Sequence, residues 1–207
     1  MKRYSTYLFD FDGTLVDSHD SLVKVFEGAY SSVGINVPLD YVLRLMRIPL
    51  FVGYEELNGP KDEESKILFE KRIIELLDDE EVLKLTKIYD DTLPMLKRLK
   101  SEGATLGIVT SNNVKHVRDV LRFLNIDEKL FSVIIGNQET KKHKPNPDPI
   151  YKALELLNIS KDGVCYVGDA LDDKRTAINA GVADILLDRA NHYPDEKGVI
   201  ITSLNEL

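Results

Sequence analysis

Hydrophobic residues recur with two different spacings along this chain, and the change of spacing divides it into regions. Between residues 18 and 87, apolar residues return every three or four positions, as the series Leu22, Val25, Phe26 and Ala29 illustrates. This repeat is typical of amphipathic helices, which bury one face. No run in this region has the character of a strand, so the sequence predicts a helical segment.

From residue 88 onward, short apolar runs alternate with helix-like stretches. The runs have no polar face, as expected of strands that are buried on both sides. Together with the opening run of the chain, they predict strands that end near residues 10, 110, 135, 167 and 187. Strands separated by helices form parallel sheets covered on both faces, so we predict an α/β fold with a doubly wound parallel sheet. Residues 1–17 and 88–207 are predicted to form this core, and residues 18–87 an inserted helical domain.

The length and composition fit one globular domain that carries an insertion. With 207 residues, of which 43% are hydrophobic and 30% charged, the chain can bury a substantial core. The formal net charge of −8 argues against nucleic acid as a partner. Binding to a phosphate backbone requires a clustered excess of lysine and arginine. Small anions are compatible with this charge where cationic groups gather locally.

The sequence predicts neither a secretory leader nor a membrane span. Lys2 and Arg3 resemble the start of a signal peptide, but the carboxylates at positions 10 and 12 end the apolar stretch too early. No stretch approaches the ~18 apolar residues of a membrane helix. The single cysteine, Cys165, lies in a strand-like run and is expected in the core. We therefore expect a cytoplasmic protein.

Two carboxylates, Asp10 and Asp12, follow the first predicted strand and precede Gly13, where the chain can turn. Like charges this close together are unfavourable unless a cation or an electrophile uses them. The pair therefore predicts a metal site, a nucleophile, or both. A simple turn or half of a calcium loop is the alternative, but calcium loops continue with oxygen ligands, whereas residues 14–16 become apolar.

Polar residues also follow the later strands. Thr110, Ser111 and Asn112 end the strand near residue 110, where they could bind phosphate or cap the next helix. Lys144 lies among three prolines, which would hold its ammonium in a fixed place. Asp169 and Asp173 are four residues apart, so they share one side if the chain is helical there. Such a pair could bind a hard cation, although acidic helix starts are also common.

The stretch Asp-Phe-Asp-Gly-Thr-Leu-Val-Asp-Ser at residues 10–18 resembles the first motif of the haloacid dehalogenase superfamily. Thr110, Lys144-Pro145 and Gly168-Asp169 resemble its second, third and fourth motifs, in the same order. The Pro-Asp-Pro after Lys144 is similar to that of phosphoglycolate-phosphatase-like members. The resemblance implies a Rossmann-like core with a small helical cap, and a magnesium-dependent phosphatase that acts on a small phosphorylated metabolite through an aspartyl-phosphate intermediate.

The resemblance also implies a role for each motif residue. Asp10 would be the nucleophile, Asp12 the general acid and base, and Lys144 the cation that neutralises charge among the carboxylates and the phosphoryl group. Phosphate would be bound by Thr110, Ser111, Asn112 and Lys144, and magnesium by Asp10, Asp12, Asp169 and Asp173.

A sugar phosphomutase, a dehalogenase and a signalling receiver domain are the alternatives to a phosphatase. Sugar phosphomutases of the family commonly carry a histidine ten residues after the acid/base aspartate, where this chain has Leu22. Dehalogenases lack the second aspartate. A signalling receiver domain gathers similar residues, but its phosphorylated aspartate follows a later strand and it has no helical insertion.

The leaving group would be selected by the cap. Arg47, with Arg44 as second candidate, interrupts an apolar segment, and a guanidinium could bind a carboxylate or hydroxyl-rich group there. A solvated helix face is the alternative for both arginines. The physiological ester and the oligomeric state are not predicted.

Overall fold

The computed structural model describes residues 2–45 and 50–207. Its contacts divide the chain into two compact units. The larger unit comprises Met1–Asp17 and Ile88–Leu207, and the smaller one Ser18–Lys87.

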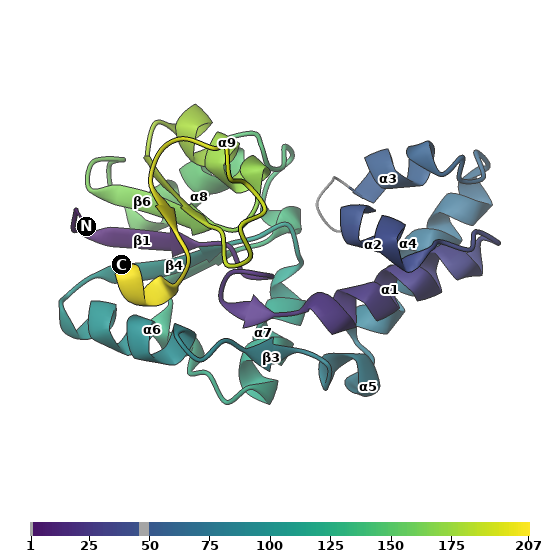
Figure 1. The fold of residues 1–207 in the computed structure, drawn as a ribbon, viewed down its shortest axis with the longest axis horizontal. Helices are drawn as coiled ribbons and strands as arrows, with labels where there is room; N and C mark the ends of the chain where they lie inside the picture. The colour runs from purple at the N-terminus through teal and green to yellow at the C-terminus, as the bar shows by residue number, and fades with distance from the viewer. Residues whose placement is uncertain (1, 46–49) are drawn as a thin grey trace. The chain divides into compact units, whose positions relative to one another are not determined.

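The larger unit is built on a six-stranded sheet with the order β5-β4-β1-β6-β7-β8 (Figure 1). All its pairs of neighbouring strands are parallel. The chain moves from β1 to one edge of the sheet and later returns to build the other edge, so β1 lies at the point where the strand order reverses. Ligands of such sheets bind beyond the carboxyl ends of the strands at this point. The predicted doubly wound parallel sheet is therefore confirmed. The strands are β1 (Thr6–Phe9), β4 (Thr105–Val109), β5 (Val133–Ile135), β6 (Val164–Gly168), β7 (Ala183–Leu187) and β8 (Ile200–Ile201).

Helices cover both faces of this sheet. Figure 1 shows α8 (Asp148–Leu157) and α9 (Leu171–Ala180) on one side, and α6 (Thr92–Ser101) and α7 (Val114–Phe123) on the other. Apolar residues of β4, β5 and β6 pack with α8 and α9 in one buried cluster, which accounts for strands without a polar face. Short 3₁₀ helices complete the unit: η1 (Glu128–Leu130), η2 (Asn137–Glu139) and η3 (Leu204–Glu206).

The smaller unit is helical. Its aromatic core joins α1, α3 and α4, with the Phe69 ring centroid 4.9 Å from that of Tyr30 and 4.7 Å from that of Tyr54. The helices are α1 (His19–Ser32), α2 (Leu39–Leu45), α3 (Leu50–Glu56), α4 (Glu63–Leu77) and α5 (Glu80–Leu83). A separate two-stranded sheet is formed by β2 (Val16–Asp17) and β3 (Lys87–Ile88).

Arg44, one of the two arginines predicted to select the leaving group, is bound within the smaller unit. Its guanidinium lies 2.9 Å from a carboxylate oxygen of Glu56 and over the ring of Tyr41. Its side chain is 56% exposed. Arg47 lies outside the described residues.

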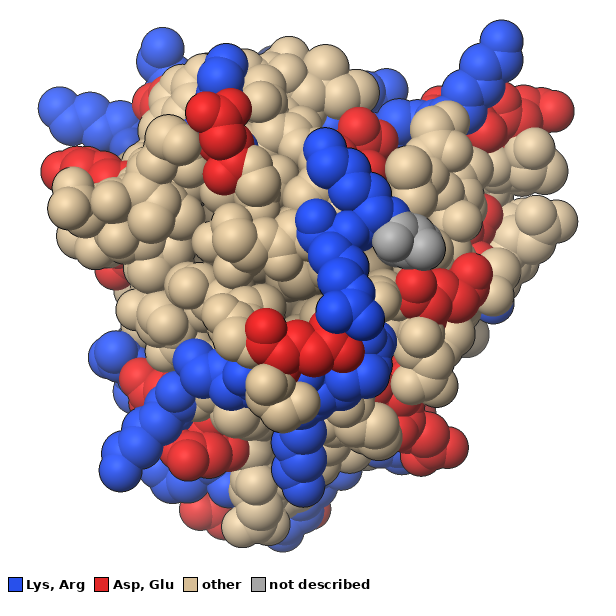
Figure 2. Space-filling view, turned by 90° about the vertical axis from the view of Figure 1, so that its left-hand side faces the viewer, with Lys and Arg blue, Asp and Glu red and all other residues tan. Residues whose placement is uncertain are grey.

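Charged side chains are unevenly spread over the face seen in Figure 2, where lysine and arginine gather in a stripe among scattered acidic residues. The net charge of −8 therefore does not represent every part of the surface. Within residues 2–45 and 50–207, no helix is both long and apolar enough to cross a membrane.

Candidate active site

The central strands of the sheet bring three polar residues to one edge. Asp10 directly follows β1, Thr110 follows β4 and Asp169 follows β6. β1 pairs with both β4 and β6, in a register that places Phe9 opposite Ile108 and Val167. The backbone N–H of Asp10 donates to the carbonyl of Val167 at 2.8 Å, which fixes the start of the turn. Residues from distant parts of the sequence thus share one site.

Lys144 lies in the middle of the acidic residues at this edge. Its Nζ is 2.8 Å from Oδ1 of Asp10 and 2.6 Å from Oδ1 of Asp173. The Lys144 side chain is 9% exposed, as is that of Asp10. The third donor of the ammonium faces the hydroxyl of Tyr166 at 3.3 Å. All three donors of Lys144 are therefore engaged by the protein.

Tyr166 is a site residue that the sequence analysis missed. It lies within β6, and its hydroxyl is 2.7 Å from the carbonyl oxygen of Val109 and 3.0 Å from Oδ1 of Asp173. A buried phenol requires such partners. The available signal was a single hydroxyl-bearing residue in an otherwise apolar strand that ends in Gly168-Asp169.

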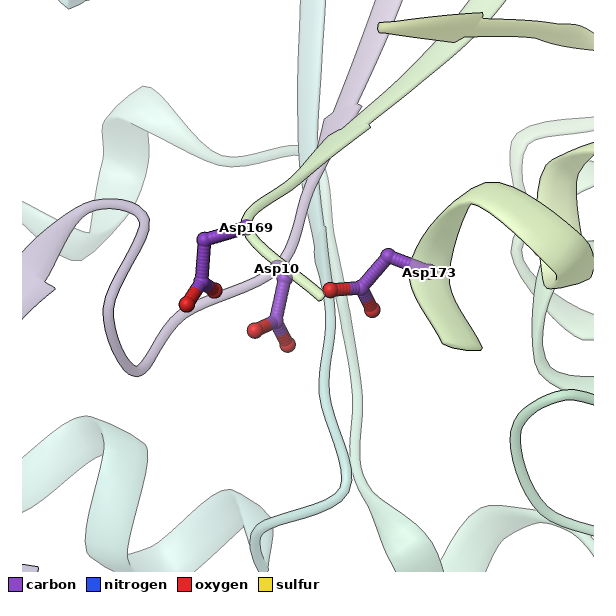
Figure 3. Close-up of side chains that lie close together, drawn as sticks. All are labelled: Asp10, Asp169 and Asp173. Atoms are coloured by element: carbon purple, nitrogen blue, oxygen red, sulfur yellow. The ribbon is translucent and has the colours of Figure 1, made fainter. Parts of the chain in front are cut away.

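Three carboxylates form a group that could hold a metal ion. Asp10, Asp169 and Asp173 each offer an oxygen, and these oxygens lie within 4.8 Å of one another. Figure 3 shows the three side chains converging from β1, from the end of β6 and from α9. Hard cations prefer carboxylate oxygens. Among the described residues, the carboxylate of Asp12 is not in this group, although the sequence analysis predicted it as a ligand.

The three carboxylates differ in how far the protein already satisfies them. Oδ1 of Asp173 accepts from Lys144 and Tyr166, and its Oδ2 accepts from the backbone N–H of Ala170 at 3.1 Å. Among the described residues, the only side-chain hydrogen bond that Asp169 accepts comes from Thr14, on Oδ1 at 3.0 Å. Asp169 therefore has the greater free capacity to bind a cation.

The charges in the group do not balance, because three carboxylates surround one ammonium. Burial, together with the charge of Asp173, raises the pKa of Asp169 to about 7. Burial also raises the pKa of Asp10 well above its ordinary value, against the lowering by Lys144. Burial alone would lower the pKa of Lys144, but the carboxylates of Asp10 and Asp173 hold it well above its ordinary value. The raised pKa values of Asp10 and Asp169 favour a cation at this group, which can take the place of a proton.

Asp12 lies beside the second motif. Its Oδ2 accepts a hydrogen bond from Nδ2 of Asn112 at 3.1 Å, whereas its Oδ1 is buried with no partner in the described part of the chain. The hydroxyl oxygen of Thr110 accepts from the backbone N–H of Asn112 at 3.1 Å. Within the described residues the Thr110 hydroxyl has no acceptor of its own, so its proton is available to a ligand. Ser111 is exposed.

Gly13 allows the first motif to approach Asp169 closely. Its φ is +77°, and a Cβ there would lie 2.5 Å from Oδ2 of Asp169. We expect Gly13→Ala to cost about 1–2 kcal/mol through its left-handed backbone and also to displace Asp169, lowering kcat. Gly103→Ala is the matched control, because Gly103 has φ +87° and no described atom within 4 Å of a new Cβ.

Urea unfolding and turnover of both variants check this prediction. Both should lose stability, but only Gly13→Ala should lose activity. Equal activity in the two variants would show that the contact with Asp169 is unimportant.

Comparison with known proteins identifies relatives of this chain. Residues 7–187 match the family described as haloacid dehalogenase-like hydrolase. A protein of Caldanaerobacter subterraneus subsp. tengcongensis, assigned as pyrophosphatase PpaX, is 31% identical over 88% of this chain and 81% of its own length. Phosphoglycolate phosphatase of Pasteurella multocida is 30% identical, over 93% and 89% of the two chains. A solved structure from Bacteroides fragilis, assigned as a haloacid dehalogenase-like hydrolase, has a TM-score of 0.88 and 28% identity, covering 99% of both chains.

The family match spans all four motifs, from Asp10 through Thr110 and Lys144 to Asp169. The Pasteurella relative agrees with the predicted likeness to phosphoglycolate phosphatases. The chain therefore belongs to the haloacid dehalogenase-like hydrolase family, which confirms the family, the fold and the enzyme class that its motifs predicted.

Proposed function

We propose that this protein is a magnesium-dependent phosphatase that hydrolyses a small phosphate monoester through an aspartyl phosphate on Asp10. The observation that carries the proposal is the 2.8 Å contact between Asp10 and the buried Lys144, at the edge where three carboxylates meet. A carboxylate nucleophile divides ester hydrolysis into two displacements at phosphorus. The names of the two relatives support phosphate esters and diphosphate as candidate substrates.

In the first displacement, an oxygen of Asp10 forms a bond to phosphorus while the bond from phosphorus to the leaving oxygen breaks. The ammonium of Lys144 keeps Asp10 in place and offsets negative charge on the phosphoryl group. The free proton of the Thr110 hydroxyl donates to a phosphoryl oxygen. Asp12 gives its proton to the leaving oxygen, which departs as an alcohol.

In the second displacement, Asp12 is ionised and acts as the base. It removes a proton from a water molecule, whose oxygen bonds to phosphorus while the bond from phosphorus to Asp10 breaks. Asp10 regains a free carboxylate and Asp12 regains its proton, so inorganic phosphate is released and the site returns to its starting state.

The donor set fits a magnesium ion. Asp10 and Asp169 would be its ligands. Asp173 would support the site indirectly, because it already accepts hydrogen bonds from Lys144, Tyr166 and Ala170. Burial, and after it the charge of Asp173, raise the pKa of Asp169 to about 7, so a cation there would relieve the cost of its negative charge. When bound, magnesium supplies positive charge to the phosphoryl oxygens.

Selection of the leaving group is assigned to the smaller unit, with Arg47 as the first candidate. Arg44 is the second, because its guanidinium is engaged by Glu56 within that unit and would have to leave this partner to bind a substrate.

Removal of divalent metal should abolish turnover of 4-nitrophenyl phosphate, and added magnesium should restore it. Asp169→Asn should raise the magnesium concentration for half-maximal rate by about tenfold or more. Asp172→Asn is the matched control, because Asp172 lies in the same helix and pairs with Arg175 at 3.0 Å. An unchanged magnesium requirement in Asp169→Asn would move the metal site elsewhere. No phosphate release by the wild type from aryl, glycolate or diphosphate substrates would contradict the proposed function.

Magnesium should bind more tightly to this site as the pH rises. The pKa of Asp169 is about 7 in the folded protein, against an ordinary value of 3.8. The stability that the proton on Asp169 contributes is full below pH 3.8 and is lost as the pH rises through about 7. Magnesium replaces that proton, so calorimetric titration should give a lower Kd at about pH 8 than at about pH 6. A Kd independent of pH would contradict this ligand assignment.

A further inference from the structure

Both polar atoms of the Asn112 side chain form hydrogen bonds. Its Oδ1 accepts a hydrogen bond from the backbone N–H of Asn113 at 2.9 Å, and its Nδ2 donates to Oδ2 of Asp12 at 3.1 Å. The amide cannot be turned over, because its NH₂ group would then face the N–H of Asn113. The backbone N–H of Asn113 thus orients the side chain of Asn112, so that its Nδ2 donates to Asp12 of the first motif.

The backbone of Asn112 is itself held from two sides. Its N–H donates to the hydroxyl of Thr110, and its carbonyl accepts from the N–H of Asn137 at 3.0 Å. A Cβ at Gly136 would lie 2.7 Å from this carbonyl oxygen, so only glycine permits the approach. The loops after β4 and β5 therefore fix the position of Asn112.

The two oxygens of Asp12 are made unequal by this contact. Oδ2 accepts the amide hydrogen of Asn112, whereas Oδ1 is buried with no partner among the described residues. The contact with Asn112 therefore fixes the orientation of the Asp12 carboxyl group.

We propose that Asn112 is a positioning residue for Asp12, which holds Oδ2 and so orients the carboxyl group that serves the leaving oxygen. This inference rests on the proposed phosphatase function. It is an alternative to the predicted role of Asn112 as a phosphate ligand, which stays a prediction, because Nδ2 carries two hydrogens and Asp12 accepts only one of them. In the first displacement, the O–H bond of Asp12 breaks as the new O–H bond of the alcohol forms, and Asp12 is left as a carboxylate.

The need for this proton depends on the leaving group. An alkoxide is a strong base and must be protonated as it departs, whereas 4-nitrophenolate departs readily without a proton. Loss of the Asn112 amide should therefore impair alkyl esters and spare the aryl ester. A residue that bound the phosphoryl group would affect both esters alike, because they share that group.

The test compares kcat/KM of Asn112→Ala on phosphoglycolate and on 4-nitrophenyl phosphate. This ratio reports the steps up to departure of the leaving group, so the later attack of water does not enter. We expect a roughly ten- to hundredfold loss on the alkyl ester, within the usual contribution of general acid catalysis, and little change on the aryl ester.

Asn113→Ala is the matched control in the same loop. Its side chain accepts from the N–H of His116 at 2.7 Å and caps α7, so its loss should lower stability without distinguishing the two esters. Binding of inorganic phosphate, measured by calorimetry with magnesium present, should be unchanged in Asn112→Ala.

Equal losses on both esters in Asn112→Ala, or weaker binding of inorganic phosphate, would overturn the positioning role while leaving the phosphatase function standing. A wild type that is inactive on both esters would overturn the proposed function and this inference with it.

Discussion

Replacing Asp10 with asparagine is expected to reduce phosphate release by about 10⁴-fold or more, as loss of a nucleophile does in other covalent enzymes. An amide of the same shape cannot attack phosphorus, yet it can still accept a hydrogen bond from Lys144. The substitution also removes one of three neighbouring negative charges. The free energy of unfolding at neutral pH should therefore be equal to or higher than that of the wild type.

Initial rates and urea unfolding of Asp10→Asn check both parts of this prediction. Asparagine can revert to aspartate by deamidation, so mass spectrometry of the assayed sample is the necessary control. Turnover near that of the wild type in a sample free of reversion would exclude Asp10 as the nucleophile.

Replacing Lys144 with methionine should have the second largest effect, because it removes the only cation in the described part of the chain that contacts Asp10 and Asp173. Breaking a buried ion pair in this way costs about 3–5 kcal/mol of stability, and loss of the charge should lower kcat by about 10² to 10³-fold. Without Lys144, the folded-state pKa values of Asp10 and its neighbours would rise further. The additional destabilisation should therefore be small where these carboxyls are protonated and should grow as the pH rises.

Urea unfolding of Lys144→Met at about pH 5 and about pH 8 tests this dependence. Lys142→Met is the matched control, because Lys142 is an exposed lysine in the same loop. A loss of stability no greater than that of Lys142→Met at the higher pH would contradict the electrostatic role of Lys144.

The main strands were predictable because burial on both faces gives each of them an unbroken apolar run. β4 and β6 are examples, with every residue of β6 buried. The pair β8 (Ile200–Ile201) was not predicted, since two residues are too few to produce a recognisable pattern. The short helices α3 and α5 lie within the predicted helical segment, but their bounds were not predictable for the same reason. With seven and four residues, these helices have at most about two turns, too few for an apolar repeat to be recognised.

Candidate site residues were predictable where they follow a strand directly, as Asp10, Thr110 and Asp169 do. Contacts that join distant loops were not. The hydrogen bond from Asn112 to Asp12 spans a hundred positions, and the one from Tyr166 to the Val109 carbonyl crosses between strands. Such pairings depend on the order of strands in the sheet, which periodicity does not encode.

The stereochemical course at phosphorus tests the central claim of a covalent intermediate most directly. A phosphorothioate monoester made chiral with oxygen isotopes would be hydrolysed in isotopically labelled water, and the configuration of the released thiophosphate determined. Each in-line displacement inverts the configuration at phosphorus. Two displacements through Asp10 therefore predict net retention, whereas net inversion would show direct attack by water and contradict the mechanism.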